Sequence, residues 1–379
     1  MRLDHHRMLK ARGVAVVLLT WCVVVEIAGC TRESDLAAYR LAVAMQQGMN
    51  PDIVVMDGEG RIVDHVTDTP QKSEMWPMWD PLGQALYYES RDRRNGTVSL
   101  TRRRLGSPTE DTLYTRAEKG ALWFTLSADG TKLAYMAKDS SQTHLDVLDL
   151  PRGSIKTLDR DGERLIRPEW APDSRQLLAQ VSASDDDLWD LVVVDTETGE
   201  RRTPLSSTDR SRFKARWALD SRSIVYCVTH DEQRRRVGLH IARVGESPQK
   251  ETVLADENDE RVISGVWSPN GTVAALRERP LPLTVFIWQN PWESREATTA
   301  ELDAELTRGR LVWSHDGEYI AANVANRRRG QREGWNIIIL DRNGRIVKTW
   351  DHDLNVICPA WAPRRAPLET MKETRHAAS

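Results

Sequence analysis

The sequence predicts an all-β protein folded as a β-propeller, with seven blades favoured and six blades as the alternative. Two observations lead to this prediction. A short tryptophan-containing element recurs at near-equal steps, and each end of the chain supplies an incomplete copy of the repeating unit. Repeats of about 40 to 50 residues that contain four strands are typical of propeller blades. The chain has 379 residues, of which 40% are hydrophobic and 29% charged, and this composition suits a globular domain.

The recurring element is a tryptophan followed by a turn sequence, and its copies lie 44 to 50 residues apart. Most copies end in Asp-Gly, Asp-Ser or Asn-Gly, which tolerate the positive φ of a tight hairpin. Each unit predicts four strands, A to D, with the tryptophan near the end of strand A, where its flat side chain fills the gap between neighbouring blades. The second copy has leucine in place of the tryptophan. The seven copies begin at Trp79, Leu126, Trp170, Trp217, Trp267, Trp313 and Trp361.

The chain ends indicate how the ring closes. Residues 40–45, 52–57 and 60–63 predict strands B, C and D without a strand A, whereas residues 357–361 predict a strand A without a strand B. We therefore expect the C-terminal strand A to pair with the N-terminal strands B to D in a single blade. A ring closed in this way leaves neither end of the chain as an open sheet edge.

Three segments carry a likeness to a known repeat: residues 168–173, residues 267–271 and residues 52–57. They resemble the TolB-like, WD-type propeller repeat, and the likeness covers residues 38–363. It implies a propeller but says little about function, because this architecture hosts many activities. TolB itself has six blades and a preceding α/β domain, which this sequence does not match. Residues 289–307 are long, polar and partly helix-like, and residues 364–379 predict a polar tail.

The N-terminus has the pattern of an export signal. A basic start is followed by the apolar run 13–25 and by Ile27-Ala28-Gly29-Cys30. This resembles the lipobox of bacterial lipoproteins, which implies a signal peptide over residues 1–29, a lipid on Cys30 and a short tether over residues 30–37. The expected location is the cell envelope, facing the periplasm and anchored to a membrane. An uncleaved anchor and a plain secretory peptide are the alternatives.

Composition limits the partners. The net charge of −3 excludes a strongly basic nucleic-acid binder, so we expect no nucleic-acid partner. A monomeric protein is also expected. Only Cys227 and Cys358 lie beyond Cys30, and the repeat places them in different blades. We therefore expect two buried thiols and no disulfide.

Motifs that carry chemistry are missing from the sequence. There is no Gly-x-Ser-x-Gly element, no metal-binding spacing of Cys or His, and no glycine-rich phosphate loop. We accordingly expect no cofactor, and a catalytic role is not the favoured interpretation.

Arginine is concentrated in three predicted loops between strands B and C, in the first, fourth and sixth blades. Guanidinium groups suit carboxylates and phosphates, so this loop face is the candidate binding site for an anionic partner. A solvated, charge-balanced rim is the alternative. The candidate ligand-binding residues are Arg91, Arg93, Arg94, Arg234, Arg235, Arg236, Arg327, Arg328 and Arg329.

An acidic cluster occupies the corresponding loop of the third blade. It lacks the glycine and the final glutamate of a calcium-binding loop, so a solvated loop is favoured over a metal site. The weak metal candidates are Asp185, Asp186, Asp187 and Asp190.

These observations favour a lipid-anchored binding or scaffold protein that uses its loop face to hold an envelope protein or an anionic glycan. The alternative is a polysaccharide lyase or another enzyme with its site in the propeller channel, because some TolB-like propellers use histidines and a divalent metal there. That alternative requires His144, His230 and the loop arginines to meet at the channel mouth.

Overall fold

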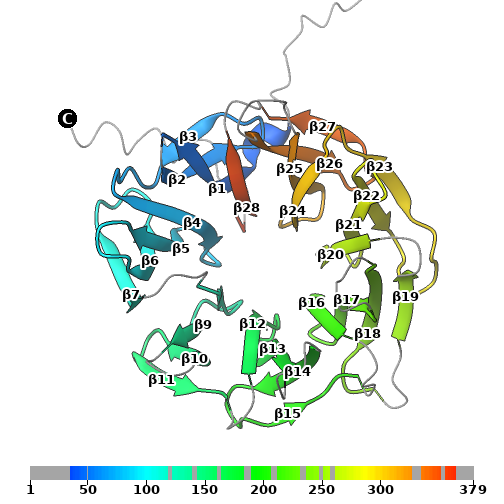
Figure 1. Ribbon diagram of the computed structural model, residues 1–379, viewed down its shortest axis with the longest axis horizontal. Coiled ribbons are helices and arrows are strands. Elements are labelled where there is room, and N and C mark those ends of the chain that lie inside the picture. The colour runs from blue at the N-terminus through cyan, green and yellow to red at the C-terminus, as the bar shows by residue number, and fades with distance from the viewer. Residues whose placement is uncertain are drawn as a thin grey trace, which may run out of the picture. The chain divides into compact units, whose positions relative to one another are not determined.

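The computed structural model describes residues 35–48, 50–117, 122–138, 143–159, 164–182, 189–205, 211–230, 236–246, 251–256, 261–326, 334–350 and 355–363. These residues form the strands β1 to β28 and one short 3₁₀ helix, η1 (Asp35–Ala38). The strands make seven four-stranded antiparallel sheets, which follow one another around a ring (Figure 1). The prediction of a seven-bladed β-propeller is confirmed.

Blade 1 consists of β4 (Lys72–Trp79), β5 (Ala85–Asp92), β6 (Val98–Arg104) and β7 (Glu110–Arg116). Blade 2 consists of β8 (Phe124–Leu126), β9 (Lys132–Lys138), β10 (Thr143–Asp149) and β11 (Ser154–Thr157). Blade 3 consists of β12 (Arg164–Trp170), β13 (Gln176–Ser182), β14 (Asp190–Asp195) and β15 (Arg201–Arg202). Blades 4 and 5 consist of β16 (Ser211–Trp217), β17 (Ser223–Thr229), β18 (Gly238–Arg243) and β19 (Glu251–Ala255); and β20 (Arg261–Trp267), β21 (Val273–Arg279), β22 (Thr284–Trp288) and β23 (Thr298–Glu301). Blades 6 and 7 consist of β24 (Leu306–Trp313), β25 (Tyr319–Asn326), β26 (Gly334–Asp341) and β27 (Ile346–Thr349); and β28 (Val356–Trp361), β1 (Arg40–Gln47), β2 (Asn50–Asp57) and β3 (Ile62–His65).

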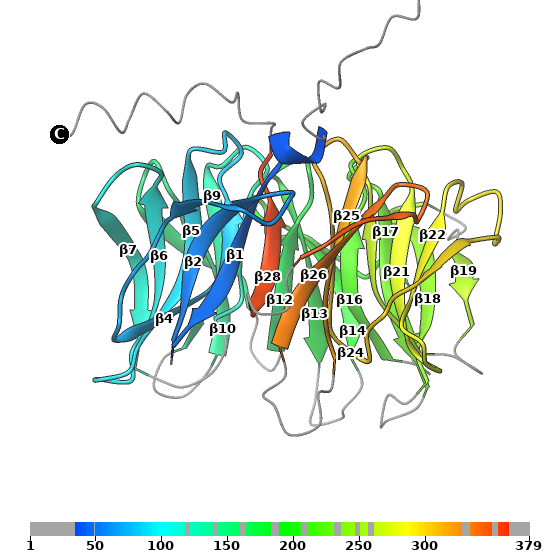
Figure 2. The same cartoon turned by 90° about the horizontal axis from the view of Figure 1, so that it is seen from above.

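The first strand of each blade is its innermost strand. Figure 1 shows β4, β12, β16, β20, β24 and β28 around the middle of the ring, and Figure 2 shows the strands from the side as they run between its two faces. Because the inner strands have a free edge toward the axis, their irregularities decide which side chains reach the middle of the ring.

Blade 7 closes the ring as the sequence predicts. Strand β28 pairs with β1 in antiparallel register, with Leu41 opposite Trp361 and Met45 opposite Val356. The C-terminal strand therefore joins the N-terminal strands β1 to β3 in one sheet. Strands β1 and β2 contribute fully buried residues to the packing on both sides of this blade.

The repeated tryptophans lie between blades, and four of them also form hydrogen bonds there. The indole N–H of Trp79 donates to the carbonyl of Ala360 at 2.9 Å, and that of Trp361 donates to Val312 at 3.0 Å. Trp170 and Trp313 make the equivalent bonds to Thr125 and Val266. Each acceptor immediately precedes the motif residue of the blade before. The tryptophan is therefore both an apolar wedge and a polar link from blade to blade.

The turns after the inner strands have the expected conformation. Ser174 and Ser221 have φ values of 58° and 53°, and glycines at the same repeat position are also left-handed. These turns contact the next blade, since the amide of Asp129 donates to the Ser174 hydroxyl at 3.0 Å and that of Asp173 to the Ser221 hydroxyl at 3.0 Å.

Three further expectations can be compared with the structure. Cys227 and Cys358 are both buried and neither forms a disulfide, as predicted. Asp35–Ala38, which the sequence assigns largely to a tether, form η1 and bury Leu36 and Ala37 against the propeller. The helix-like character expected for residues 289–307 is wrong: this segment holds a turn and the outer strand β23. Within the described part of the chain, no helix is long and apolar enough to cross a membrane.

Candidate axial binding site

The inner strands share a β-bulge at one repeat position. The ladder between the first and second strands shifts register in blades 1, 3, 4 and 5 close to Trp76, Arg167, Lys214 and Ser264, each of which has a positive φ between 51° and 60°. Side chains other than glycine rarely adopt this conformation, and bulges redirect the side chain of the extra residue. Strained residues of this kind are concentrated at functional sites, so their repetition around one axis indicates a site there.

In blades 1, 3, 4, 5 and 7 the residue with the positive φ lies three positions before the motif residue, and Trp123 and Arg310 occupy the same repeat position in blades 2 and 6. We name the resulting set the axial ring, and it takes one residue from each blade in chain order. The axial ring consists of Trp76, Trp123, Arg167, Lys214, Ser264, Arg310 and Cys358.

Two arginines of the axial ring stack on its two tryptophans. The guanidinium of Arg167 lies 4.4 Å from the ring centroid of Trp123, and that of Arg310 lies 5.5 Å from the ring centroid of Trp76. The second pair joins blade 6 to blade 1, with blade 7 between them, so this contact links inner strands that are not direct neighbours in the ring. Trp123 is 40% exposed, which leaves its indole within reach of a ligand. Such cation–π contacts are worth about 0.5–2 kcal/mol.

An ion pair lies two residues further along the inner strands than the axial ring. Glu169 and Arg216 each precede a motif tryptophan by one residue, and Nη1 of Arg216 lies 2.6 Å from Oε2 of Glu169. Burial raises the pKa of Glu169, while the positive charges of Arg216 and Arg310 act in the opposite direction. Burial likewise lowers the pKa of Arg310. Residues from blades 3, 4 and 6 therefore share one electrostatic environment.

Positive charge exceeds negative charge in this cluster. The relevant positions in each inner strand are the axial-ring position and the position two residues later. Among the described residues, these positions hold four cations, Arg167, Lys214, Arg216 and Arg310, and one carboxylate, Glu169. A like-charged group of this kind is costly without a counter-ion when solvent access is limited. The arrangement is therefore suited to an anionic ligand.

Of the loop arginines that the sequence singled out, the structure describes Arg91, Arg93, Arg94 and Arg236. Arg91 pairs through Nε with the fully buried Glu89 at 2.5 Å, and Arg94 donates to the side chain of Gln71. Arg93 and Arg236 are exposed. The remaining candidates, Arg234, Arg235, Arg327, Arg328 and Arg329, lie outside the described residues, as does Cys30.

The acidic cluster of blade 3 lies mostly beyond the described residues, since Asp185, Asp186 and Asp187 are not among them. Oδ1 of Asp190 lies 3.1 Å from Nη1 of Arg212, a side chain that is 1% exposed. Asp190 is therefore the counter-ion of a buried arginine. In the described ranges, no group of three or more His, Cys, Asp or Glu is arranged to hold a metal ion.

The histidines required by the enzyme interpretation lie apart from the axial ring. His144 is 3.6 Å from Asp146 within blade 2, and His230 is exposed at the end of β17 in blade 4. His240 is buried and pairs with Glu251 at 2.6 Å in the outer half of blade 4. Among the described residues, the arginines that stack on the axial-ring tryptophans come from the inner strands.

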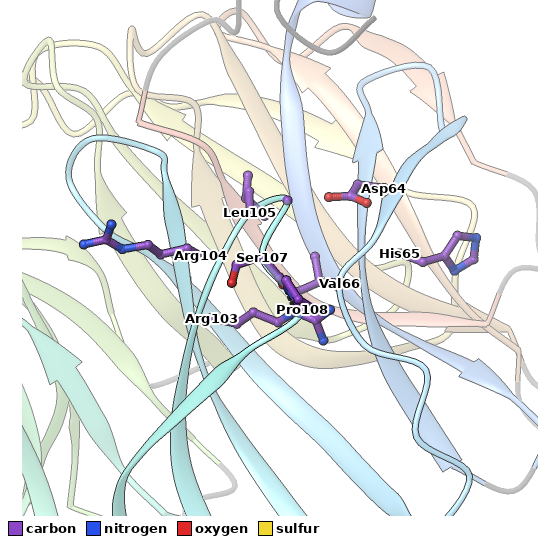
Figure 3. Close-up of a pocket in the computed structure, with 9 residues that line it drawn as sticks. Asp64, His65, Val66, Arg103, Arg104, Leu105, Ser107 and Pro108 are labelled. Carbon is purple, nitrogen blue, oxygen red and sulfur yellow. Dashed lines mark hydrogen bonds between the residues drawn. The ribbon is translucent and has the colours of Figure 1, made fainter. Parts of the chain in front are cut away.

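A surface pocket of about 280 Å³ lies between the outer strand of blade 7 and the outer turn of blade 1. Figure 3 shows that His65 and Arg104 point away from each other on opposite sides of it. Its polar groups do not converge, whereas those of the axial ring do. We therefore place the candidate site at the axis.

The sequence contained a signal for the axial ring. The repeat register fixes the position three residues before each motif residue, and aligning the repeats would have collected two tryptophans, two arginines and a lysine at that position. Nothing in the residue types themselves shows that a bulge turns them toward the axis.

No protein-family model matches this chain, and no curated protein matches its sequence. Many solved structures share the fold of this chain, but their sequence identity to it is low. A prolyl endopeptidase structure aligns with a TM-score of 0.57 and 15% identity over 74% of this chain, which spans 42% of that enzyme. An oligogalacturonate lyase in complex with manganese aligns with a TM-score of 0.55 and 14% identity, covering 77% of this chain and 82% of that one.

TolB from Acinetobacter baumannii aligns with a TM-score of 0.49 and 15% identity over 86% of this chain and 82% of its own. The chain is a seven-bladed β-propeller with distant structural similarity to a prolyl endopeptidase and to oligogalacturonate lyase. These neighbours include enzymes, so the fold alone leaves the function open.

Proposed function

We propose that this protein is a binding module that holds an acidic glycan at the axial ring. The observation that carries the proposal is the placement of Arg167, Lys214, Arg216 and Arg310 at equivalent positions of the inner strands, with Glu169 as the single carboxylate at these positions among the described residues. Guanidinium groups form two parallel hydrogen bonds with carboxylates, and these are stronger than neutral hydrogen bonds.

The two tryptophans favour a glycan over a small inorganic anion. Trp76 and Trp123 belong to neighbouring blades, whereas the cations come from blades 3, 4 and 6. Because Arg167 and Arg310 stack on these two indoles, the axial ring offers flat apolar surface and positive charge side by side. A sugar acid combines a flat ring face with a carboxylate, which matches this pairing.

Binding of oligouronates by the full chain tests the proposal. We expect Arg167→Met and Arg310→Met each to weaken binding by roughly 10- to 150-fold, because each removes a charge-assisted hydrogen bond worth ~1.5–3 kcal/mol. The matched control is Arg93→Met with Arg94→Met on the loop face, which should leave the affinity unchanged. Isothermal titration calorimetry measures both. If the loop variant alone lost binding, the loop face that the sequence suggested would be the site.

The enzyme alternative uses the same residues. Glu169, whose pKa burial raises, lies against Arg216, and a carboxylate beside a guanidinium is one arrangement for removing a proton next to a substrate carboxylate. A lyase would shorten the oligouronate and form an unsaturated product with ultraviolet absorbance. Unchanged ligand recovered after prolonged incubation would favour the binding module.

We also propose that Cys30 carries the lipid that anchors the protein in the cell envelope, with envelope glycan as its partner. The lipobox pattern of residues 27–30 supports this proposal. Cys30→Ala should move the protein from the membrane fraction to the soluble fraction of the expressing cells, whereas Cys22→Ala should not. Equal membrane association of both variants would contradict the anchor.

A further inference from the structure

One end of the ring is formed by the turns that join the first strand of a blade to the second and the third strand to the fourth, and we name it the turn face. The helix η1, the first described element of the chain, lies at this end (Figure 2). The hydroxyl of Tyr39 donates to Oδ2 of Asp316, in the turn between β24 and β25, at 2.5 Å. The carbonyl of Tyr39 accepts from the amide of Gly58, in the turn between β2 and β3, at 3.1 Å. The chain therefore enters the propeller at the turn face.

Most exposed large hydrophobic side chains of the described residues lie at the same end. Leu82 and Leu219 lie in turns after the inner strands of blades 1 and 4, and they are 58% and 62% exposed. Four others begin the outer strands of blades 2, 6 and 7, directly after a turn of this face. Of the remaining two, Trp123 belongs to the axial ring and Leu281 lies in the turn between β21 and β22 at the opposite end. The apolar side chains of the turn face are Ile62, Leu82, Ile155, Leu219, Ile346 and Val347.

The two leucines are presented by turns with internal hydrogen bonds. In blade 1, Oδ1 of Asp80 accepts from the amide of Ala85 at 2.8 Å. In blade 4, Oδ1 of Asp220 accepts from the amide of Ser223 at 2.7 Å. Leu82 occupies the repeat position that holds Asp or Asn in blades 2 to 6, so the turn itself does not require a leucine there. An apolar side chain on an ordered turn loses little conformational entropy when it is covered.

We propose that the turn face lies on the surface of a lipid bilayer, with Leu82 and Leu219 in its headgroup layer. The proposal rests on the lipid that we assign to Cys30 and adds an orientation to that anchor. Cys30 precedes Asp35 by five residues, and an extended chain spans at most about 3.6 Å per residue, so the lipidated residue lies within roughly 18 Å of η1. The anchor therefore brings these side chains, and no others as exposed at the opposite end, close to lipid.

Two separated apolar contacts fix an orientation that a tether alone leaves free. Blades 1 and 4 lie on opposite sides of the ring (Figure 1), so Leu82, Leu219 and the start of η1 are three points of one face. Transfer of apolar side chains from water into lipid is favourable, and a single acyl chain alone holds a protein only marginally. In this orientation the end of the ring that carries Leu281 points away from the membrane.

Fluorescence quenching by nitroxide lipids tests the orientation. The full chain is expressed, extracted from the membrane fraction and reconstituted in vesicles of phosphatidylethanolamine and phosphatidylglycerol. Leu82→Cys and Leu219→Cys each carry a polarity-sensitive dye, and Leu281→Cys is the matched control, because Leu281 is 58% exposed at the opposite end. The wild type corrects for labelling of Cys227 and Cys358, which are buried. Interfacial side chains lie roughly 5–10 Å below the membrane surface, so we expect nitroxide lipids to quench the dyes at 82 and 219 about twofold more than the dye at 281.

The orientation and the anchor fail separately in this experiment. Equal quenching at the three positions, or stronger quenching at 281, in protein that stays on the vesicles would overturn the orientation and leave the lipid on Cys30 intact. A protein missing from the membrane fraction would contradict the lipid on Cys30 and the orientation with it. Dyes at 82 and 219 that are shielded without vesicles, in a protein that sediments as a dimer, would assign the turn face to a second copy of the chain and also overturn the proposal.

Discussion

Trp350→Ala should lower the free energy of unfolding by about 3–5 kcal/mol, the largest effect we expect from a single substitution in this propeller. Trp350 follows β27 and is 1% exposed. Its indole N–H donates to the carbonyl of Gly58 in blade 7 at 3.0 Å, and its ring packs on Gly60, where an added Cβ would lie 3.0 Å from Cδ1. This side chain therefore joins blade 6 to the blade that closes the ring.

Urea unfolding followed by circular dichroism measures this loss. Trp123→Ala is the matched control, because the same side chain is removed at a position that is 40% exposed, and we expect it to cost less than about 1 kcal/mol. Equal losses in the two variants would show that closure does not depend on the contact between blades 6 and 7.

Glu74→Gln should stabilise the protein at alkaline pH. Glu74 is 1% exposed, and its carboxyl accepts hydrogen bonds from the hydroxyls of Thr69 at 2.7 Å and Ser90 at 3.2 Å, with no ion-pair partner among the described residues. Burial is the largest cause that raises its pKa, to about 7, and the nearby Asp52 raises it further. The proton is therefore bound more tightly in the folded chain than in the unfolded chain.

The sign of the effect follows from this difference. The stabilisation from the bound proton is complete below the unfolded pKa, near 4.5, and is lost as the pH rises through about 7. It corresponds to a loss on the order of 3 kcal/mol across that window. Glutamine keeps the shape and the carbonyl acceptor, so the variant should lack this loss and exceed the wild type in stability at pH 8.

Unfolding free energies measured from pH 4.5 to pH 8 test this prediction. The control is Glu246→Gln, which removes an exposed carboxylate paired with Arg243 at 3.1 Å and should leave the pH dependence unchanged. A wild-type stability that stayed constant across the window, or a Glu74→Gln variant that followed the wild-type curve, would contradict the assignment.

The fold could be predicted from the sequence because a repeat imposes its own register. The steps between motif residues, the turn sequences ending in Gly or Ser, and the two partial units at the chain ends gave the blade number and the closure. The indole hydrogen bonds could not be predicted, since they depend on the placement of one blade against the next. Trp79 and Trp361 are examples. Each indole N–H donates to a backbone carbonyl of another blade, and the alternating apolar pattern of a strand does not reveal which carbonyl that is.

The candidate site was harder to predict for a physical reason. Arg167 and Trp123 are 44 residues apart in the chain, and Arg310 and Trp76 are more than 200 apart, yet each pair is stacked. The stacked side chains share one repeat position, at which a bulge with a positive φ occurs in blades 1, 3, 4, 5 and 7, and residue type alone does not reveal a positive φ at a lysine or an arginine. Runs such as Arg91–Arg94 are conspicuous in the sequence, but Arg91 instead neutralises the buried Glu89.

The most direct test of the anion site at the axial ring is crystallographic. Crystals of the protein soaked in selenate and measured at the selenium absorption edge would locate bound oxyanions without any assumption about the natural ligand. The axial ring predicts an anomalous peak within hydrogen-bonding distance of Arg167, Lys214 or Arg310. Peaks confined to the exposed loop arginines Arg93 and Arg94, with none at the axis, would contradict the account.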